Sequence, residues 1–345
     1  MKRVGVSDLP LHPGRCPPWL FKRMKTLAGL VSEAIILEYG TDEFLRRLAN
    51  PYFFQSFGCV LGFDWHSSGV TTTTMGALKE ALDPEKHGIA VLGGKGGTSR
   101  KTPFEIESAS QTFPLTDEET EFLKYASRMA AKVDSSAVQD GYQLYHHNFI
   151  LAENGNWAVV QQGMNNANRY ARRYHWLSQE LESFVSEPHT AICCDFRGRT
   201  LDMTAKDSKN ARKASVDLVK DGLGEVRKLL VMGSFHWIDN SVYKRLLDLN
   251  EFQPRNYEEL LAFQGVGPKT IRALALTSKL VYGTEASWKD PVQFSFSRGG
   301  KDGTPFPVER DAYDESSQML RNALDNAKLG NKEKLAAIRR LENFA

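Results

Sequence analysis

One stretch decides the fold of the C-terminal half, residues 256–276, which read NYEELLAFQGVGPKTIRALAL. Asn256 is a residue type that caps helix N-termini, and a glutamate follows three positions later. Gly265 and Gly267 permit a tight turn, and Pro268 suits the first turn of a second helix. The sequence therefore predicts two short helices joined by a hairpin.

This helix-hairpin-helix, expected at residues 256–283, would expose backbone N–H groups beside the N-terminus of its second helix. Such a nest binds a phosphate without reading the base sequence, which favours double-stranded DNA as the partner. The residues expected to contact DNA here are Gly265, Val266, Gly267, Lys269 and Thr270. The alternative is an ordinary pair of helices joined by a glycine turn.

The Gly265–Thr270 core, GVGPKT, resembles the motif of the helix-hairpin-helix DNA glycosylase superfamily. The resemblance implies base excision, with Lys269 at the position of the lysine that attacks C1′ of a flipped nucleotide in bifunctional members. A lysine that only contacts phosphate is the alternative. No cysteine cluster follows the hairpin, so the resemblance excludes the iron–sulfur variant.

The same resemblance implies a catalytic carboxylate further along the chain. Asp290 has the expected spacing from the lysine but lacks the flanking pattern. The segment 307–313, PVERDAY, matches that pattern better and offers Glu309 or Asp311, after a glycine-rich insertion. An acidic pair favoured by a helix dipole is the alternative explanation of that segment.

A second candidate site is the glycine-rich segment 93–103, GGKGGTSRKTP, which follows an apolar strand at 89–92. It lacks the ending of a Walker A loop, so we expect contacts to a nucleic-acid backbone rather than nucleotide hydrolysis. A basic and aromatic segment, 164–176, is expected to act similarly. The residues expected to bind DNA in the two segments are Gly94, Lys95, Gly96, Ser99, Arg100, Lys101, Arg172 and Arg173. A flexible loop and ordinary surface are the alternatives.

No cofactor is expected, but one group of side chains could hold a divalent metal ion. Its members are Asp64, His66, Asp140, His146 and His147. Carboxylate and imidazole ligands suit Mg²⁺ or Mn²⁺ in a nuclease, although the spacing matches no metal signature. Hydrogen-bonded structural histidines are the commoner outcome.

Composition and charge exclude several classes of protein. The 345 residues are 41% hydrophobic and carry a net charge of only +2, so disorder is excluded and charge alone does not indicate nucleic-acid binding. No apolar run is long enough for a membrane span, and the basic start lacks the apolar core of a signal peptide. Four cysteines without metal-type spacing favour the reducing cytoplasm, with no membrane partner.

The order of predicted elements suggests two domains. Residues 1–205 are expected to form an α+β domain, which includes a helix at 18–39 that ends at Gly40, a second helix that begins at Thr41, and a buried strand at 52–65. Thr116 and Glu119 have the spacing of a capping box for a helix at 117–132, and Asn154-Gly155 indicates a hairpin. Residues 206–345 are expected to form an all-α domain, because strand signals fade there. The fold class is therefore an α+β domain followed by an all-α helix-hairpin-helix domain.

The chain also resembles, from end to end, a family of archaea and some bacteria that is catalogued only as a domain of unknown function. The segments that carry this resemblance are 8–12, 57–73, 93–103, 140–147 and 160–165.

Three functions follow from these observations. The leading one is a DNA-repair enzyme, a glycosylase that acts on a damaged or modified base in duplex DNA, with or without AP lyase activity. A metal-dependent DNA nuclease with its site in the N-terminal domain is the second, and a DNA-binding protein without enzymatic activity is the third.

Overall fold

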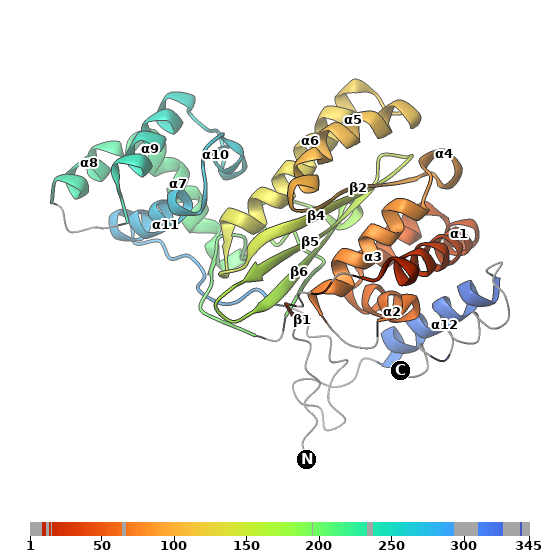
Figure 1. The fold of residues 1–345 in the computed structure, drawn as a ribbon. Helices are drawn as coiled ribbons and strands as arrows, with labels where there is room; N and C mark the ends of the chain where they lie inside the picture. The colour runs from red at the N-terminus through yellow and green to blue at the C-terminus, as the bar shows by residue number, and fades with distance from the viewer. Residues whose placement is uncertain are drawn as a thin grey trace, which may run out of the picture.

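A sheet of antiparallel strands forms the middle of the molecule in the computed structural model, which describes residues 9–11, 14, 16–63, 67–194, 196–232, 237–292, 310–326 and 339. The strand order is β1-β6-β5-β4-β2, with β7 also paired to β6. The strands are β1 (Leu9–Pro10), β2 (Ile89–Lys95), β4 (Gln143–Ala152), β5 (Trp157–Asn165), β6 (Tyr170–Leu177) and β7 (Ala191–Cys193). A separate pair joins β3 (Val138–Gln139) to β8 (Leu201–Asp202). Figure 1 shows the sheet between two groups of helices.

The first face of the sheet is covered by α1 (Pro18–Ala49), α2 (Pro51–Leu61), α3 (Ser68–Ala81) and α12 (Arg310–Asn326). A short helix, α4 (Pro84–His87), precedes β2. Alternate strand residues such as Ile89 and Val91 face this layer, and their neighbours Ala90 and Leu92 face the other. Because helices cover both sides of the sheet, most positions of β4, β5 and β6 are buried, the polar ones included.

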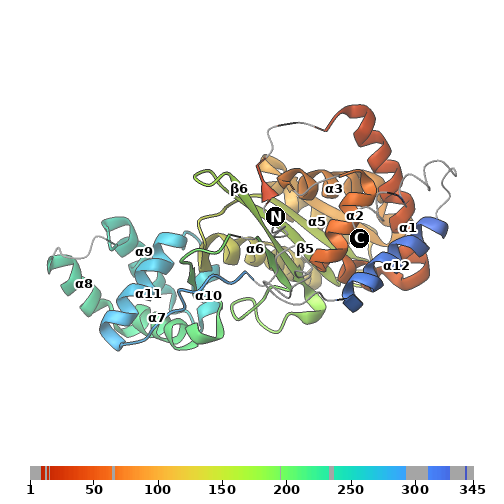
Figure 2. The ribbon, with the colours of Figure 1, turned by 90° about the horizontal axis from the view of Figure 1, so that it is seen from below.

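The second face packs on α5 (Thr102–Thr112) and α6 (Asp117–Lys132), and the same core continues into a helical unit. That unit contains α7 (Lys209–Asp221), α8 (Leu223–Met232), α9 (Asn240–Phe252), α10 (Tyr257–Ala262) and α11 (Pro268–Tyr282). Figures 1 and 2 place the helical unit at one end of the molecule and α1, α2 and α12 at the other.

The predicted fold class is wrong in its division of the chain. Helix α12 does not belong to the helical unit but returns to pack against α1 and α2, so the C-terminal half is not one all-α domain. The strand predicted at 52–65 is helix α2, whose N-terminus is capped by Asn50. Its residues are buried all round, and this removes the periodicity that separates a helix from a strand.

Local signals were more reliable. Thr116 and Glu119 form the capping box predicted for α6, and Gly155 turns β4 into β5. Gly40 has a φ of 86°, which kinks α1 at the point where the sequence predicts a helix to end and another to begin. Within the described residues, no helix combines the length and the apolar character that crossing a membrane requires.

The chain passes from the sheet to the helical unit and back through two segments that lie side by side, here together called the neck. The chain enters at β8 and leaves at residues 287–292, and the two segments are joined by a backbone bridge between Asp202 and Ser287. The Asp202 N–H donates to the Ser287 carbonyl at 2.9 Å, and the Ser287 N–H donates to the Ser208 hydroxyl at 2.8 Å. The neck is therefore a fixed part of the structure.

Candidate nucleic-acid interface

The α10–α11 hairpin has the local geometry expected from its sequence. The Asn256 side chain caps α10 by accepting from the Glu259 N–H at 2.9 Å, whereas the Glu259 carboxylate binds Arg255 instead of completing a capping box. Gly265 has a φ of 83°, and the Arg245 guanidinium lies 2.5 Å from where its Cβ would be. The backbone conformation favours glycine at this position, whereas the Arg245 guanidinium ends a flexible side chain that could move aside.

The N-terminus of α11 has free hydrogen-bond donors. Its N-cap residue is Gly267, which has no side chain to cap the helix, and Pro268 occupies the first turn. Among the hydrogen bonds of the described residues, none is donated by the N–H groups of Lys269 or Thr270. By contrast, Asp239 caps α9 with its carboxylate. The open N–H groups and the helix dipole together suit an anion.

Cationic side chains surround this helix end. Lys269 and Arg272 are exposed on the first turns of α11, and Arg245 lies against Gly265. Lys132 donates from Nζ to the Phe263 carbonyl at 3.3 Å, and burial together with nearby Arg245 lowers its pKa. Arg245 also pairs with Asp248 at 2.8 Å, so part of the positive charge is already balanced.

The hairpin is fixed to α6 and β3 by side-chain contacts. Gln139 of β3 donates from Nε2 to the Pro268 carbonyl at 2.8 Å, and its Oε1 accepts from Arg272 Nε at 2.8 Å. Tyr125 of α6 donates its hydroxyl to Glu258 at 2.7 Å. The hairpin therefore has a set orientation relative to the rest of the molecule.

The glycine-rich segment adopts an ordered conformation at the edge of the sheet. Strand β2 extends to Lys95, and a 3₁₀ helix, η1 (Gly96–Lys101), leads into α5. A Cβ at Gly93 would lie 2.3 Å from the His147 carbonyl oxygen, so glycine is required there. Gly96, with a φ of 59°, has open space around it, and the residues of η1 lie mostly at the surface.

A cavity of about 260 Å³, here called the basic cavity, lies between η1, α6 and β4. Its cationic residues are Arg100 and Arg128, and Lys95 lies over the ring of Tyr145, which also lines it. His146 lines the cavity while only 2% exposed, and neither of its ring nitrogens has a hydrogen-bond partner among the described residues. Burial and the neighbouring His147 lower the pKa of His146 to about 3, so its ring is neutral near pH 7.

Helix α6 connects the basic cavity with the hairpin. Arg128 and Ala131 line the cavity, and Lys132 contacts the hairpin. Arg128 and Lys132 are one helical turn apart, which corresponds to about 6 Å along the axis. Positive side chains therefore extend from one candidate site to the other.

Two arginines expected to bind DNA are buried instead. Arg172 is 0% exposed and forms ion pairs of 2.9 Å with both Asp140 and Asp290. Although burial opposes its charge, these carboxylates raise the pKa of Arg172. Arg173 is also 0% exposed and donates to Thr71 and His175. Neither side chain reaches the surface, so the expected contacts to DNA do not fit this structure.

Two of the three residues expected to supply a carboxylate to Lys269, Asp290 and Asp311, lie in the described part of the chain. Asp290 accepts hydrogen bonds from Arg172 and from the Gly198 N–H, at 2.9 and 2.8 Å. Asp311 lies in the first turn of α12, and Figures 1 and 2 show α12 and α11 at opposite ends of the molecule. Glu309 lies outside the described residues.

The alternative metal site is only partly described, because Asp64 and His66 lie outside the described residues. His147 uses both ring nitrogens, at 2.9 Å from Ser127 Oγ and 2.8 Å from Gln161 Oε1. Asp140 is paired with Arg172. The described part of the chain contains no group of three or more His, Cys, Asp or Glu side chains suited to a metal ion.

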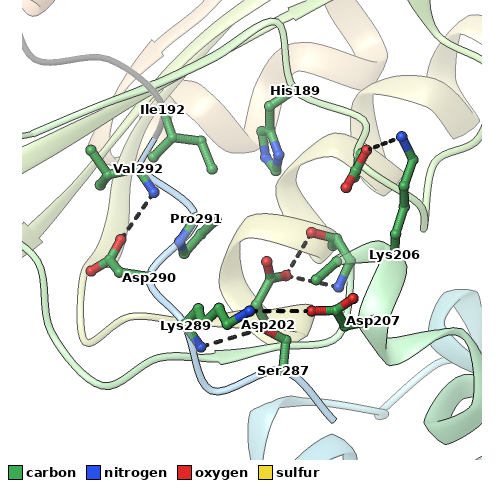
Figure 3. A pocket seen from close by; sticks show the side chains of 13 residues that line it. His189, Ile192, Asp202, Lys206, Asp207, Ser287, Lys289, Asp290, Pro291 and Val292 are labelled. Carbon is green, nitrogen blue, oxygen red and sulfur yellow. Dashed lines mark hydrogen bonds and ion pairs between the residues drawn. The ribbon is translucent and has the colours of Figure 1, made fainter. Parts of the chain in front are cut away.

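A second cavity of about 260 Å³ lies at the neck and was not predicted from the sequence. Its lining includes His189 and Asp202, and Figure 3 shows both side chains directed into the same space. Asp134, His189 and Asp202 come from three separate segments and match no motif. The only local signal is the Asp-x-Thr spacing at 202–204, which suits a side-chain turn.

Over residues 5–308 the chain matches the protein family described as "Protein of unknown function (DUF763)". The chain belongs to this family. No curated protein and no solved structure matches it. The expected resemblance to a family of unknown function is therefore confirmed over nearly the whole chain, and the relation to DNA glycosylases is not shown.

Proposed function

We propose that the protein binds the sugar–phosphate backbone of duplex DNA through the α10–α11 hairpin. The observation that carries the proposal is the open N-terminus of α11, where the N–H groups of Lys269 and Thr270 have no acceptor among the described residues. A phosphate oxygen supplies the missing acceptors, and Lys269 and Arg272 add charge beside it.

The basic cavity supports a second backbone contact. Arg100 and Arg128 line it, and Lys95 and Lys101 lie exposed on the adjoining segment. Because α6 carries Arg128 toward the cavity and Lys132 toward the hairpin, one strand of a duplex could contact both positions. Binding through phosphates at both sites makes the affinity depend strongly on salt and weakly on sequence.

Fluorescence anisotropy with a labelled duplex tests this proposal. Lys269→Ala should weaken binding about tenfold, since a hydrogen bond to a charged group contributes roughly 1.5 kcal/mol. It should also reduce the slope of log K against log salt by about 0.9, one phosphate contact. Lys213→Ala is the matched control, because Lys213 is an exposed lysine of α7 paired with Asp217. If the two variants lost the same amount of duplex affinity, the hairpin would not be the binding site.

Base excision is the second candidate function, and the position of Lys269 favours it. Its side chain is exposed on the first turn of α11, beside the N–H groups that would hold a phosphate. In this reaction the neutral amine attacks C1′ of the nucleotide, and the base leaves with a proton as its bond to C1′ breaks. The C1′–O4′ bond of the sugar ring then opens, O4′ takes the second proton of the amine, and a Schiff base forms. The reaction also needs a carboxylate near Lys269. Asp290 already accepts hydrogen bonds from Arg172 and from the Gly198 N–H, so another residue has to supply that carboxylate.

A lesion panel in EDTA tests base excision. Duplexes with uracil, hypoxanthine, 8-oxoguanine or an alkylated adenine are incubated with the protein and borohydride, and adducts are resolved on a denaturing gel. A trapped adduct that is lost in Lys269→Arg, which keeps the positive charge, supports the reaction. Turnover only after addition of Mg²⁺ or Mn²⁺ would support the nuclease instead. Duplex binding without turnover under either condition leaves DNA binding as the function.

A further inference from the structure

The neck cavity presents two hydrogen-bond acceptors to one space. Asp202 is 4% exposed, and its Oδ1 accepts from the Thr204 N–H at 2.8 Å and the Thr204 hydroxyl at 2.6 Å. Its second oxygen, Oδ2, accepts none of the hydrogen bonds found among the described residues. Burial raises the pKa of Asp202, while the Thr204 bonds, nearby His189 and the Ala205 N–H oppose the shift. This oxygen can be reached from the cavity that Asp202 lines, so a ligand bound there can donate a hydrogen bond to it.

His189 provides the second acceptor. Its Nε2 hydrogen-bonds to Asp134 Oδ1, and a carboxylate can only accept, so the proton lies on Nε2. In the neutral ring, Nδ1 is then the acceptor nitrogen, and none of the described residues donates a hydrogen bond to it. Asp134 is held in turn by Gln161 and by Trp176 Nε1, the latter at 3.1 Å, so the His189 ring has one orientation.

The remaining wall of the cavity is apolar and its rim is charged. Ile192, Pro291 and Val292 line one side, as Figure 3 shows. At the rim, Lys206 pairs with Glu187 at 2.9 Å and Lys289 with Asp207 at 3.5 Å. The two lysine side chains are 81% and 85% exposed, so both are available to a ligand that carries an anion.

We propose that the neck cavity binds a guanine nucleotide by the edge of its base. Guanine is flat and presents two adjacent donors, N1–H and the 2-amino group, which match the acceptors Asp202 Oδ2 and His189 Nδ1. The ring lies against the apolar wall, and the phosphate reaches Lys206 or Lys289. A volume of about 260 Å³ suits one base, with the ribose and the phosphate toward the rim. This site is separate from the hairpin and does not depend on DNA binding there.

Isothermal titration calorimetry with the intact protein tests the site. We expect GMP to bind at least about tenfold more tightly than inosine monophosphate, which lacks the 2-amino group, because an unmatched buried acceptor is costly. Adenosine and uridine monophosphates should bind no better than inosine monophosphate. A single-stranded oligonucleotide with one guanine distinguishes a base within DNA from a free nucleotide.

Asp202→Asn is the matched variant, since the amide is isosteric and keeps an oxygen for Thr204. Its NH₂ group would face the donors of guanine, so GMP binding should be lost while duplex binding at the hairpin is retained. Lys289→Ala together with Lys206→Ala should reduce the preference for GMP over guanosine. Circular dichroism and the duplex affinity show that each variant is folded.

Three results would overturn the proposal. They are equal affinities for GMP and inosine monophosphate, unchanged GMP binding in Asp202→Asn, and no binding of GMP at millimolar concentration. Methylguanidine carries the same pair of donors without a base or phosphate. If it bound more tightly than GMP, the site would instead be one for an arginine side chain.

Discussion

The hairpin and the neck cavity leave opposite kinds of polar group without a partner. At the hairpin these are the backbone N–H donors of Lys269, which is exposed, and of Thr270, which is 5% exposed, at the start of α11. At the neck they are acceptors, on the buried side chains of His189 and Asp202. Donors select anions such as phosphate, and acceptors select the N–H edge of a base. The comparison suggests that one protein has separate sites for the two chemical parts of a nucleotide.

The largest effect is expected from the buried ions that hold the neck. Arg172→Leu leaves Asp140 and Asp290 buried without a positive partner, and Asp290 belongs to the segment that lines the neck cavity. The free energy of unfolding should fall by roughly 3–5 kcal/mol, measured by urea denaturation.

Arg100→Ala is the control for this change, because Arg100 is exposed beside the basic cavity. It should weaken DNA binding and change the free energy of unfolding by less than about 0.5 kcal/mol. If Arg172→Leu instead weakened DNA binding with stability unchanged, Arg172 would have to contact DNA directly.

Acid should destabilise the protein through histidines buried in their neutral form. The pKa of His146 is about 3 in the folded protein, against an ordinary value near 6.5 in the unfolded chain. Between these values the unfolded chain binds more protons, so the free energy of unfolding falls as the pH falls, by up to about 1.4 kcal/mol per pH unit.

His146→Gln should make the free energy of unfolding fall less steeply with pH, by the contribution of about one proton. Urea denaturation at several values between about pH 4 and 7 measures this slope. The lowered pKa values of His147 and His175, also due to burial, leave part of the slope in place. An unchanged slope in His146→Gln would contradict a neutral, buried His146.

Gly267→Asp should stabilise the folded protein and at the same time weaken duplex binding at the hairpin. A Cβ at Gly267 meets nothing within 4 Å, and its φ of −142° is accessible to any residue. The carboxylate should cap α11 and raise the free energy of unfolding by roughly a few tenths of a kcal/mol over glycine, and by about 1 kcal/mol over Gly267→Ala. It would also occupy the open N–H groups and repel phosphate, so duplex affinity should fall.

Gly267→Ala is the matched control, because it adds a Cβ without an acceptor. Thermal melts and anisotropy on both variants give the two readouts. If Gly267→Asp bound the duplex as tightly as Gly267→Ala, the open helix end would not be where the phosphate binds.

The smallest effect is expected at the rim of the neck. Lys289 is 85% exposed and lies 3.5 Å from Asp207, so Lys289→Ala should change the free energy of unfolding by less than about 0.5 kcal/mol. A larger loss in urea denaturation would mean that the rim holds the neck together, and that its lysines are not free to meet a ligand.

The elements that the sequence predicted are those with local causes. The Asn256 cap, the glycines of the hairpin and the capping box of α6 act within a few residues, and the structure contains all of them except the back-bond from Glu259. The return of α12 to α1 and α2 depends on packing between distant parts of the chain, which no local pattern encodes.

Contacts between distant parts of the chain also explain which functional residues the sequence predicted wrongly. The sequence predicted Arg172 and Arg173 to be cations at the surface, because no acidic residue lies close to them in the sequence. The partners of Arg172 are 32 and 118 residues away, so its burial depends on the tertiary fold. The neck cavity was missed because Asp134, His189 and Asp202 meet only after folding.

The bridge between Asp202 and Ser287 has a consequence for how the chain folds as it is synthesised. The bridge joins the two ends of the segment that forms the helical unit. All residues of that unit are therefore present once residue 287 has left the ribosome. The first layer of helices, in contrast, lacks α12 until residues 310–326 have also been synthesised. The helical unit can therefore form its own contacts while part of the apolar surface of α1 and α2 is still uncovered, and that surface is where a nascent chain would need protection from aggregation.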